Sequence, residues 1–256
     1  MTNERLISFY TLFKREFLRF FKVPNNTIAP PLITVLFYFL IFGVALGSRI
    51  DQVQGVNYLL FILPGLFVQT LINGSYSNPS GSLFISRQFG SITDVLVAPI
   101  SYPQMVLAHV LAGMSRGLVL AGGTLLIALI FTSIQIHSPF LLLAYVLLIS
   151  ILFACAGIMI GLWSKDFEQL NIFINFIVTP LTFLGGVFYT LDMVPTWMAT
   201  VTQANPIFYM INGVRYGMIG IADGYVYTGL IILTLASILA FYVAYTLIKK
   251  GYNLRD

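Results

Sequence analysis

Apolar residues along the chain gather in six runs, each about as long as a bilayer-spanning helix. Such a helix needs roughly 20 apolar residues to cross the hydrocarbon core. The pattern therefore predicts six membrane spans, at residues 28–47, 57–78, 110–134, 139–163, 170–190 and 226–248. A shorter apolar stretch, 205–221, opens with Asn205-Pro206 and carries Arg215, whose charge would be costly near the centre of a bilayer.

Positive charges gather at the two ends of the chain. They are Arg5, Lys14, Arg15, Arg19 and Lys22 before the first run, and Lys249, Lys250 and Arg255 after the last. Because cytoplasmic segments are enriched in Lys and Arg, both termini are expected in the cytoplasm, which requires an even number of crossings. We therefore expect the short stretch 205–221 to be re-entrant or interfacial, within a segment 191–225 that faces outward.

The residues before the first run predict an amphipathic helix over 3–22. Its apolar positions recur at helical spacing: Leu6, Phe9, Tyr10, Phe13, Phe17, Phe20 and Phe21. Arg15, Arg19 and Lys22 fall on the opposite face. Such a helix is typical of the cytoplasmic membrane interface. Two interpretations remain open, an anchor that fixes topology and a lever that moves the spans.

Composition agrees with an integral membrane protein, since 58% of the residues are hydrophobic and only 9% are charged. The single cysteine, Cys155, predicts no disulfide within the chain. The sequence lacks a phosphate-binding loop, an H-E-x-x-H motif and a His/Cys cluster. We therefore expect no catalytic site, no metal site and no cofactor in this chain, and the bilayer rather than nucleic acid as its surroundings.

Polar residues inside the spans are few and uncharged. In the fifth run they lie at helical spacing on one face: Asn171, Asn175, Thr179 and Thr182. Gln69, Thr70 and Asn73 lie in the second run. Two interpretations remain open, the lining of a translocation path and hydrogen bonding between helices. The absence of carboxylates inside the spans argues against a carrier driven by an ion gradient.

The cytoplasmic connection after the second run contains a short, mostly apolar segment, 84–99. We expect Arg87 and Asp94 on one short helix that stops at Pro99. An apolar segment too short to span the membrane indicates a surface for a protein partner, or else a second interfacial helix.

Three further motifs carry a family resemblance over nearly the whole chain. They are G-S-I-T-D-V-L-V-A-P-I-S at 90–101, P-L-T-F-L-G-G-V-F-Y at 180–189, and N-P-x-x-Y-x5-R-x4-G, formed by Asn205, Pro206, Tyr209, Arg215 and Gly220. With the amphipathic helix and six runs, their order and spacing resemble the membrane permeases of ABC-2 type ATP-binding cassette exporters. Small bacterial permeases of this type serve drug, polysaccharide or lipo-oligosaccharide export.

The resemblance implies one transmembrane domain over residues 1–256 in the bacterial inner membrane. It implies a connecting helix at 3–22 and a coupling helix within 84–99, with Arg87, Asp94, Leu96 and Pro99 as candidate ATPase contacts. The partner would be a separate nucleotide-binding ATPase subunit in two copies, which binds the ATP and Mg, and the permease would form a homodimer.

The resemblance implies that 191–225 is an extracellular re-entrant hairpin before the last span and that it forms the outer gate. Arg215 would then lie at the outer interface, beside a lipid phosphate or a backbone carbonyl. The alternative is that Arg215 only locks the hairpin. For the whole chain the alternatives are a self-contained channel or secondary carrier, and a scaffold or membrane enzyme. The substrate expected of an exporter with this interior is hydrophobic, amphipathic or lipid-linked, and its identity stays open.

Overall fold

The protein is almost entirely helical in the computed structural model, which describes residues 2–46 and 52–254. Four helices are long and apolar enough to cross a membrane. They are α4 (Tyr58–Gln88), α6 (Tyr102–Phe131), α7 (Pro139–Trp163) and α12 (Val226–Lys250). These helices confirm the second, third, fourth and sixth predicted spans and the all-α fold class.

The first and fifth predicted spans are helical but change from α-helix to π-helix along their length. The first comprises α3 (Ala29–Tyr38) and the π-helical η1 (Phe39–Leu46), and the short α2 (Pro24–Thr27) precedes it. The fifth comprises α8 (Phe167–Ile172), the π-helical η2 (Phe173–Val178) and α9 (Thr179–Phe183). In the fifth, Pro180 cannot donate a backbone hydrogen bond, which favours an irregular turn before it. The described structure therefore confirms four long spans rather than six.

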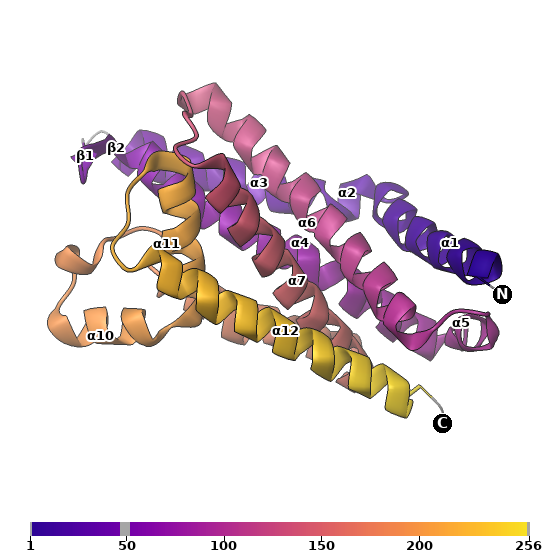
Figure 1. Ribbon diagram of the computed structural model, residues 1–256. Coiled ribbons are helices and arrows are strands. Elements are labelled where there is room, and N and C mark those ends of the chain that lie inside the picture. The colour runs from indigo at the N-terminus through magenta and orange to yellow at the C-terminus, as the bar shows by residue number, and fades with distance from the viewer. Residues whose placement is uncertain (1, 47–51, 255–256) are drawn as a thin grey trace.

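Helix α4 is the central element of the bundle. It packs against both α6 and α7, and α12 packs on the outside of α7 (Figure 1). The approach is close because Gly113 and Gly117 of α6, and Gly157 and Gly161 of α7, bring their backbones against the backbone of α4. Side chains at these four positions would displace the neighbouring helix, so the small residues set the distance between the helices.

Two helix ends differ from the apolar pattern. Helix α4 continues ten residues past the predicted end at 78, and α6 begins at Tyr102 rather than 110. The predicted connection 79–109 is therefore reduced to 89–101, which contains the short helix α5 (Ile92–Val97). Hydropathy locates the hydrocarbon core, but the hydrogen bonds of a helix continue through polar residues when neighbouring helices cover them.

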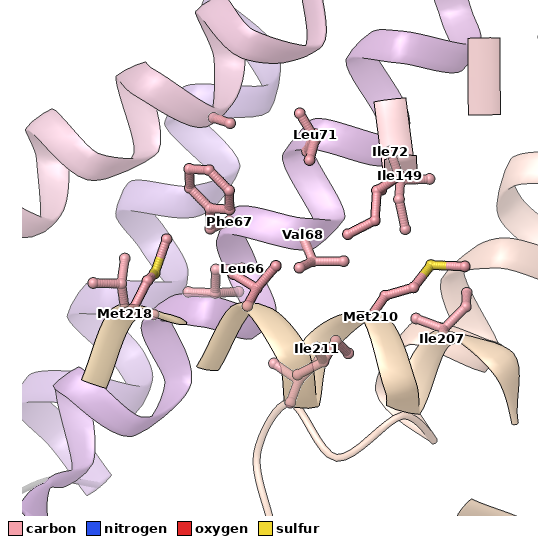
Figure 2. Packing of buried hydrophobic residues seen from close by; sticks show 14 of the residues in the cluster. Leu66, Phe67, Val68, Leu71, Ile72, Ile149, Ile207, Met210, Ile211 and Met218 are labelled. Atoms are coloured by element: carbon pink, nitrogen blue, oxygen red, sulfur yellow. The ribbon is translucent and has the colours of Figure 1, made fainter. Parts of the chain in front are cut away.

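The end of the bundle opposite the two termini carries the smaller elements (Figure 1). They are the strands β1 (Gln52–Val53) and β2 (Val56–Asn57), the 3-10 turn η3 (Leu191–Met193), and the helices α10 (Thr196–Ala204) and α11 (Pro206–Ile219). Figure 2 shows α11 packing its apolar face, Ile207, Met210, Ile211 and Met218, against Leu66, Phe67, Val68, Leu71 and Ile72 of α4. Helix α11 is therefore part of the hydrophobic core.

Helix α1 (Thr2–Phe21) confirms the predicted N-terminal helix, but its orientation differs from the expected one. It packs along the first half of α6, with Leu12, Glu16 and Phe20 buried at helical spacing. Part of the predicted apolar face is instead exposed, including Leu6 and Tyr10. The face toward the protein thus contains a carboxylate, and the exposed apolar residues are free to contact lipid.

Candidate functional site

The short helix α5 lies at the terminal end of the bundle and presents part of its surface outward. Ile92 and Val95 are buried and hold the helix on the bundle, whereas Asp94 and Pro99 are exposed and Leu96 is half-buried. Val97 just after Leu96 is 83% exposed. An exposed apolar side chain beside a carboxylate is a surface that a protein partner can cover.

Two cavities flank α5, and they separate its candidate residues. Leu96 lines a cavity of about 630 Å³ that also reaches Arg87 and Lys165. Asp94 lines a cavity of about 240 Å³ on the other side, between α5 and the Arg15 side of α1. Helix α5 is thus held on the bundle by Ile92 and Val95 and has a cavity on each side.

Arg87 does not belong to the same short helix as Asp94, which corrects the sequence-based expectation. It lies in the last turn of α4 and donates hydrogen bonds to the carbonyls of Gly161, Leu162 and Ser164, at 3.0, 2.7 and 3.2 Å. These carbonyls are at the C-terminal end of α7, where a helix leaves its last carbonyl groups without partners. Arg87 therefore joins α4 to α7 directly beneath the α5 surface.

A buried charged cluster attaches α1 to the bundle. Glu16 is 1% exposed, accepts hydrogen bonds from Arg15 at 2.9 and 3.1 Å, and accepts another from the hydroxyl of Ser82. Arg19 lies 3.6 Å from the Glu16 carboxylate and donates to the carbonyl of Asn78 at 2.6 Å. Burial opposes ionisation of Glu16, yet the neighbouring cations and the Ser82 hydroxyl together hold its pKa below its usual value.

At the opposite end, the N-P-x-x-Y-x5-R-x4-G motif marks the two ends of α11. The Asn205 side chain accepts a hydrogen bond from the N–H of Ile207 at 2.9 Å, Pro206 occupies the first helical position, and Gly220 ends the helix with φ of 76°. These are the residue types that start and stop helices. Half-buried Tyr209 lies between them. Three of the candidate gate residues therefore shape the helix.

Arg215 is enclosed by protein. It is 1% exposed, and its guanidinium lies 3.3 Å from the carboxylate of Asp223 and 4.1 Å from the ring centre of Phe61. It also donates a hydrogen bond to the carbonyl of Gly186. The expected backbone carbonyl is thus present, while a lipid phosphate has no access. Arg215 joins α11 to α4 and to the segment after α9.

Asp223 is a partner of Arg215 that sequence reasoning treated as an ordinary loop acid. Its backbone N–H donates to Asn212 at 2.7 Å, and its carboxylate accepts from Gln54 at 2.6 Å. The left-handed conformation of Gly220 turns the chain back, which brings Asp223 beside a residue eight positions earlier. A glycine closing a helix between two opposite charges was the signal that could have predicted this pair.

The polar stripe of the fifth predicted span is divided by the structure. Asn175 and Thr179 line a cavity of about 340 Å³ together with Gln69 and Asn73 of α4. Asn171 is instead exposed and donates to the carbonyl of Phe167, and Thr182 is buried and bonds to Val178 within its own helix. The π-helical turns of η2 have more residues per turn than an α-helix, so the 3.6-residue spacing does not keep all four on one face.

Comparison with known proteins identifies the family. The ABC-2 type transporter family matches residues 7–219. The chain belongs to this family. It is 34% identical over 250 residues to the inner membrane transport permease YadH of Escherichia coli (strain K12), covering 98% of each chain. It is also 24% identical over 220 residues to nodulation protein J of Rhizobium meliloti (strain 1021), covering 82% of this chain and 80% of that protein.

The match places this ABC-2 permease among multi-pass membrane transport components. The matched stretch runs from within α1 to the last residue of α11. Both the α5 surface and the polar cavity between α4 and η2 lie inside it, as does Arg215. Gly220 and Asp223 lie just beyond its end. Four long apolar helices agree with such a membrane permease.

Proposed function

We propose that this permease is the membrane subunit of an ATP-driven exporter that moves a hydrophobic, amphipathic or lipid-linked substrate out of the cytoplasm. Two copies would form a homodimer and bind two copies of a separate ATPase subunit, which would hold the ATP and Mg. Membership of the ABC-2 type transporter family supports this assignment. The resemblance to nodulation protein J and YadH supports transport but leaves the substrate open.

The observation that carries the proposal is the polar cavity on the side of the bundle. Its lining includes the amide side chains of Gln69, Asn73 and Asn175. Amide groups facing hydrocarbon would lack hydrogen-bond partners, which is costly in a bilayer. A second copy placed against this side would cover the cavities of both copies and create a polar path between them. Asn175 and Thr179 are therefore the best supported of the four candidate pathway residues.

The proposed topology has six crossings, with both termini in the cytoplasm of a bacterial inner membrane. The two termini lie at the same end of the bundle (Figure 1), as an even number of crossings requires. The first and fifth helical segments would complete the four long spans, because backbone irregularities are tolerated where protein or a polar cavity covers them. The segment 191–225, with α10 and α11, would be the re-entrant outer gate.

Helix α5, within 84–99, would act as the coupling helix and α1, within 3–22, as the connecting helix. ATP binding would close the ATPase dimer, and closure would displace both helices. The permease would then change from an inward-facing to an outward-facing state because ATP binds the closed state more tightly. Exposed Asp94 and Pro99, with half-buried Leu96, form the proposed docking surface, and Arg87 joins α4 to α7 near it.

The test is permease-dependent ATP hydrolysis in liposomes that contain this chain and its candidate ATPase. We expect Asp94→Arg combined with Leu96→Glu to abolish co-purification and ATP turnover while the variant still elutes as a folded protein. The matched control is Asp192→Arg combined with Leu191→Glu, which changes the same residue types at the opposite end and should leave co-purification with the ATPase unchanged.

Two results would contradict the proposal. Equal activity of the α5 variant and wild type would remove α5 as the coupling element. Movement of solute by the permease alone, with no ATPase bound to the wild type, would favour the self-contained channel or carrier instead.

A further inference from the structure

Three buried polar atoms without hydrogen-bond partners lie at one junction of the bundle. Among the described residues, five buried side-chain nitrogen or oxygen atoms lack such a partner, and three of them belong to Arg19 of α1, Asn78 of α4 and Arg116 of α6. Arg19 contacts Asn78 directly, and its charge acts on Arg116. Arg19 Nε still lies 3.6 Å from the Glu16 carboxylate, whereas Asn78 Nδ2 and Arg116 Nε have no acceptor, and such donors are satisfied when an anion or another acceptor binds.

The charges at this junction do not balance. Arg116 lies on α6 and the exposed Lys22 follows Arg19 by one helical turn, while Arg15 and Arg19 share one carboxylate, that of Glu16. Its two oxygens already accept from Arg15 and from a serine hydroxyl and lie near Arg19. For Arg116 the described structure shows one hydrogen bond, to a backbone carbonyl, and no carboxylate partner. Within the described residues the Glu16 carboxylate therefore serves Arg15 and Arg19, and Arg116 is left without a counter-ion.

The junction is level with the point where the chain first enters the apolar part of the bundle. The carbonyl that Arg116 contacts, at 3.1 Å, belongs to Thr27, the last residue of α2 and two residues before α3 begins. Apolar side chains beside the cations are exposed, with Phe21 at 42% and Val23 at 50%. Cations beside exposed apolar side chains match the phosphate and acyl chains of a lipid.

We propose that Arg19, Arg116 and Lys22 bind the phosphate of an anionic phospholipid at the membrane surface nearest the two termini. The guanidinium groups would donate to phosphate oxygens, which they match in geometry and charge. Phe21 and Val23 would contact the acyl chains. The bound phosphate would relieve the repulsion between the two arginines and join α1 to α6 through the lipid.

The test uses the full-length protein in a neutral detergent and measures lipid binding by native mass spectrometry and by thermal stabilisation. The probes are phosphatidylglycerol, phosphatidylcholine and inorganic phosphate. We expect wild type to bind phosphatidylglycerol at least tenfold more tightly than phosphatidylcholine, and Arg116→Gln and Arg19→Gln each to lose about tenfold of the affinity for phosphatidylglycerol. Arg5→Gln removes an exposed arginine from the same helix and should leave it unchanged.

The remaining outcomes decide between the sources of the phosphate. Competition by millimolar inorganic phosphate that displaces phosphatidylglycerol completely would show that the site takes free phosphate rather than a lipid. Equal affinity of Arg116→Gln, Arg19→Gln and Arg5→Gln for phosphatidylglycerol would overturn the proposal. If Arg116→Gln does not fold, Arg116→Lys replaces it, because lysine keeps the charge but not the forked donors. Unchanged binding of phosphatidylglycerol in both Arg116→Lys and Arg19→Gln would then overturn the proposal.

Discussion

The ion pair between Arg215 and Asp223 allows a quantitative prediction. Both side chains are almost fully buried, with 1% and 4% of their side-chain surface exposed. Asp223→Asn keeps the shape of the side chain but leaves the guanidinium buried without its counter-ion. Removing one partner of a buried pair typically costs about 3–5 kcal/mol. The contacts of Arg215 with Gly186 and Phe61 remain, so we expect a loss near the lower value.

Thermal unfolding of the purified protein in detergent, followed by fluorescence, measures this loss. A destabilisation of about 3 kcal/mol corresponds to a decrease in Tm of roughly 6–12 °C for a chain of this size. Asp192→Asn is the matched control, because Asp192 is exposed in the same outer segment and its change should stay within about 0.5 kcal/mol. Combining Arg215→Met with Asp223→Asn should recover much of the loss, since the double variant has no buried charge that needs a counter-ion.

The reasoning would be refuted by a Tm of Asp223→Asn equal to that of Asp192→Asn. It would also fail if the stability lost in the double variant equalled the sum of the losses in Arg215→Met and Asp223→Asn, because the two charges would then not be coupled.

Three further substitutions test separate contacts. Gly213→Ala would place a methyl group on the ring of Tyr145 and should cost about 1–3 kcal/mol of stability in thermal unfolding, whereas Gly122→Ala meets open space and should be neutral or stabilising. Arg87→Ala removes three hydrogen bonds to the end of α7 and should increase hydrogen exchange there, with no change at α11. Glu16→Gln should lower the Tm at neutral pH. Because the pKa of Glu16 is held low in the folded protein, the stabilisation that its ionised carboxylate provides is lost as pH falls. The difference in Tm between wild type and Glu16→Gln should therefore shrink below about pH 4.

Hydropathy predicts the parts of this fold that the bilayer determines. The cores of α4, α6, α7 and α12 were predictable because each contains enough apolar residues to cross the membrane. Helix ends were not, because packing rather than lipid covers the polar end of α4. Ser82 lies beyond the predicted end of its span and is buried against Glu16. No hydropathy window contains that information.

The candidate site was predictable where backbone conformation depends on residue type. Asn205, Pro206 and Gly220 predict the ends of a helix, and they have that role in α11. Pairings across the fold were less predictable. Asp223 resembles any loop acid until the turn at Gly220 is known, and the π-helical turns of η2 could not be read from the spacing of polar residues.

Helix α4 connects the three polar regions of the permease. Near its N-terminus Phe61 contacts Arg215, in its middle Gln69 lines the polar cavity, and near its C-terminus Ser82 bonds to α1. Two internal prolines, Pro64 and Pro79, separate these regions. Each proline removes one backbone hydrogen bond, so bending is easiest at these two positions. A displacement of α1 would therefore act on the cavity through a helix that is able to bend on either side of it.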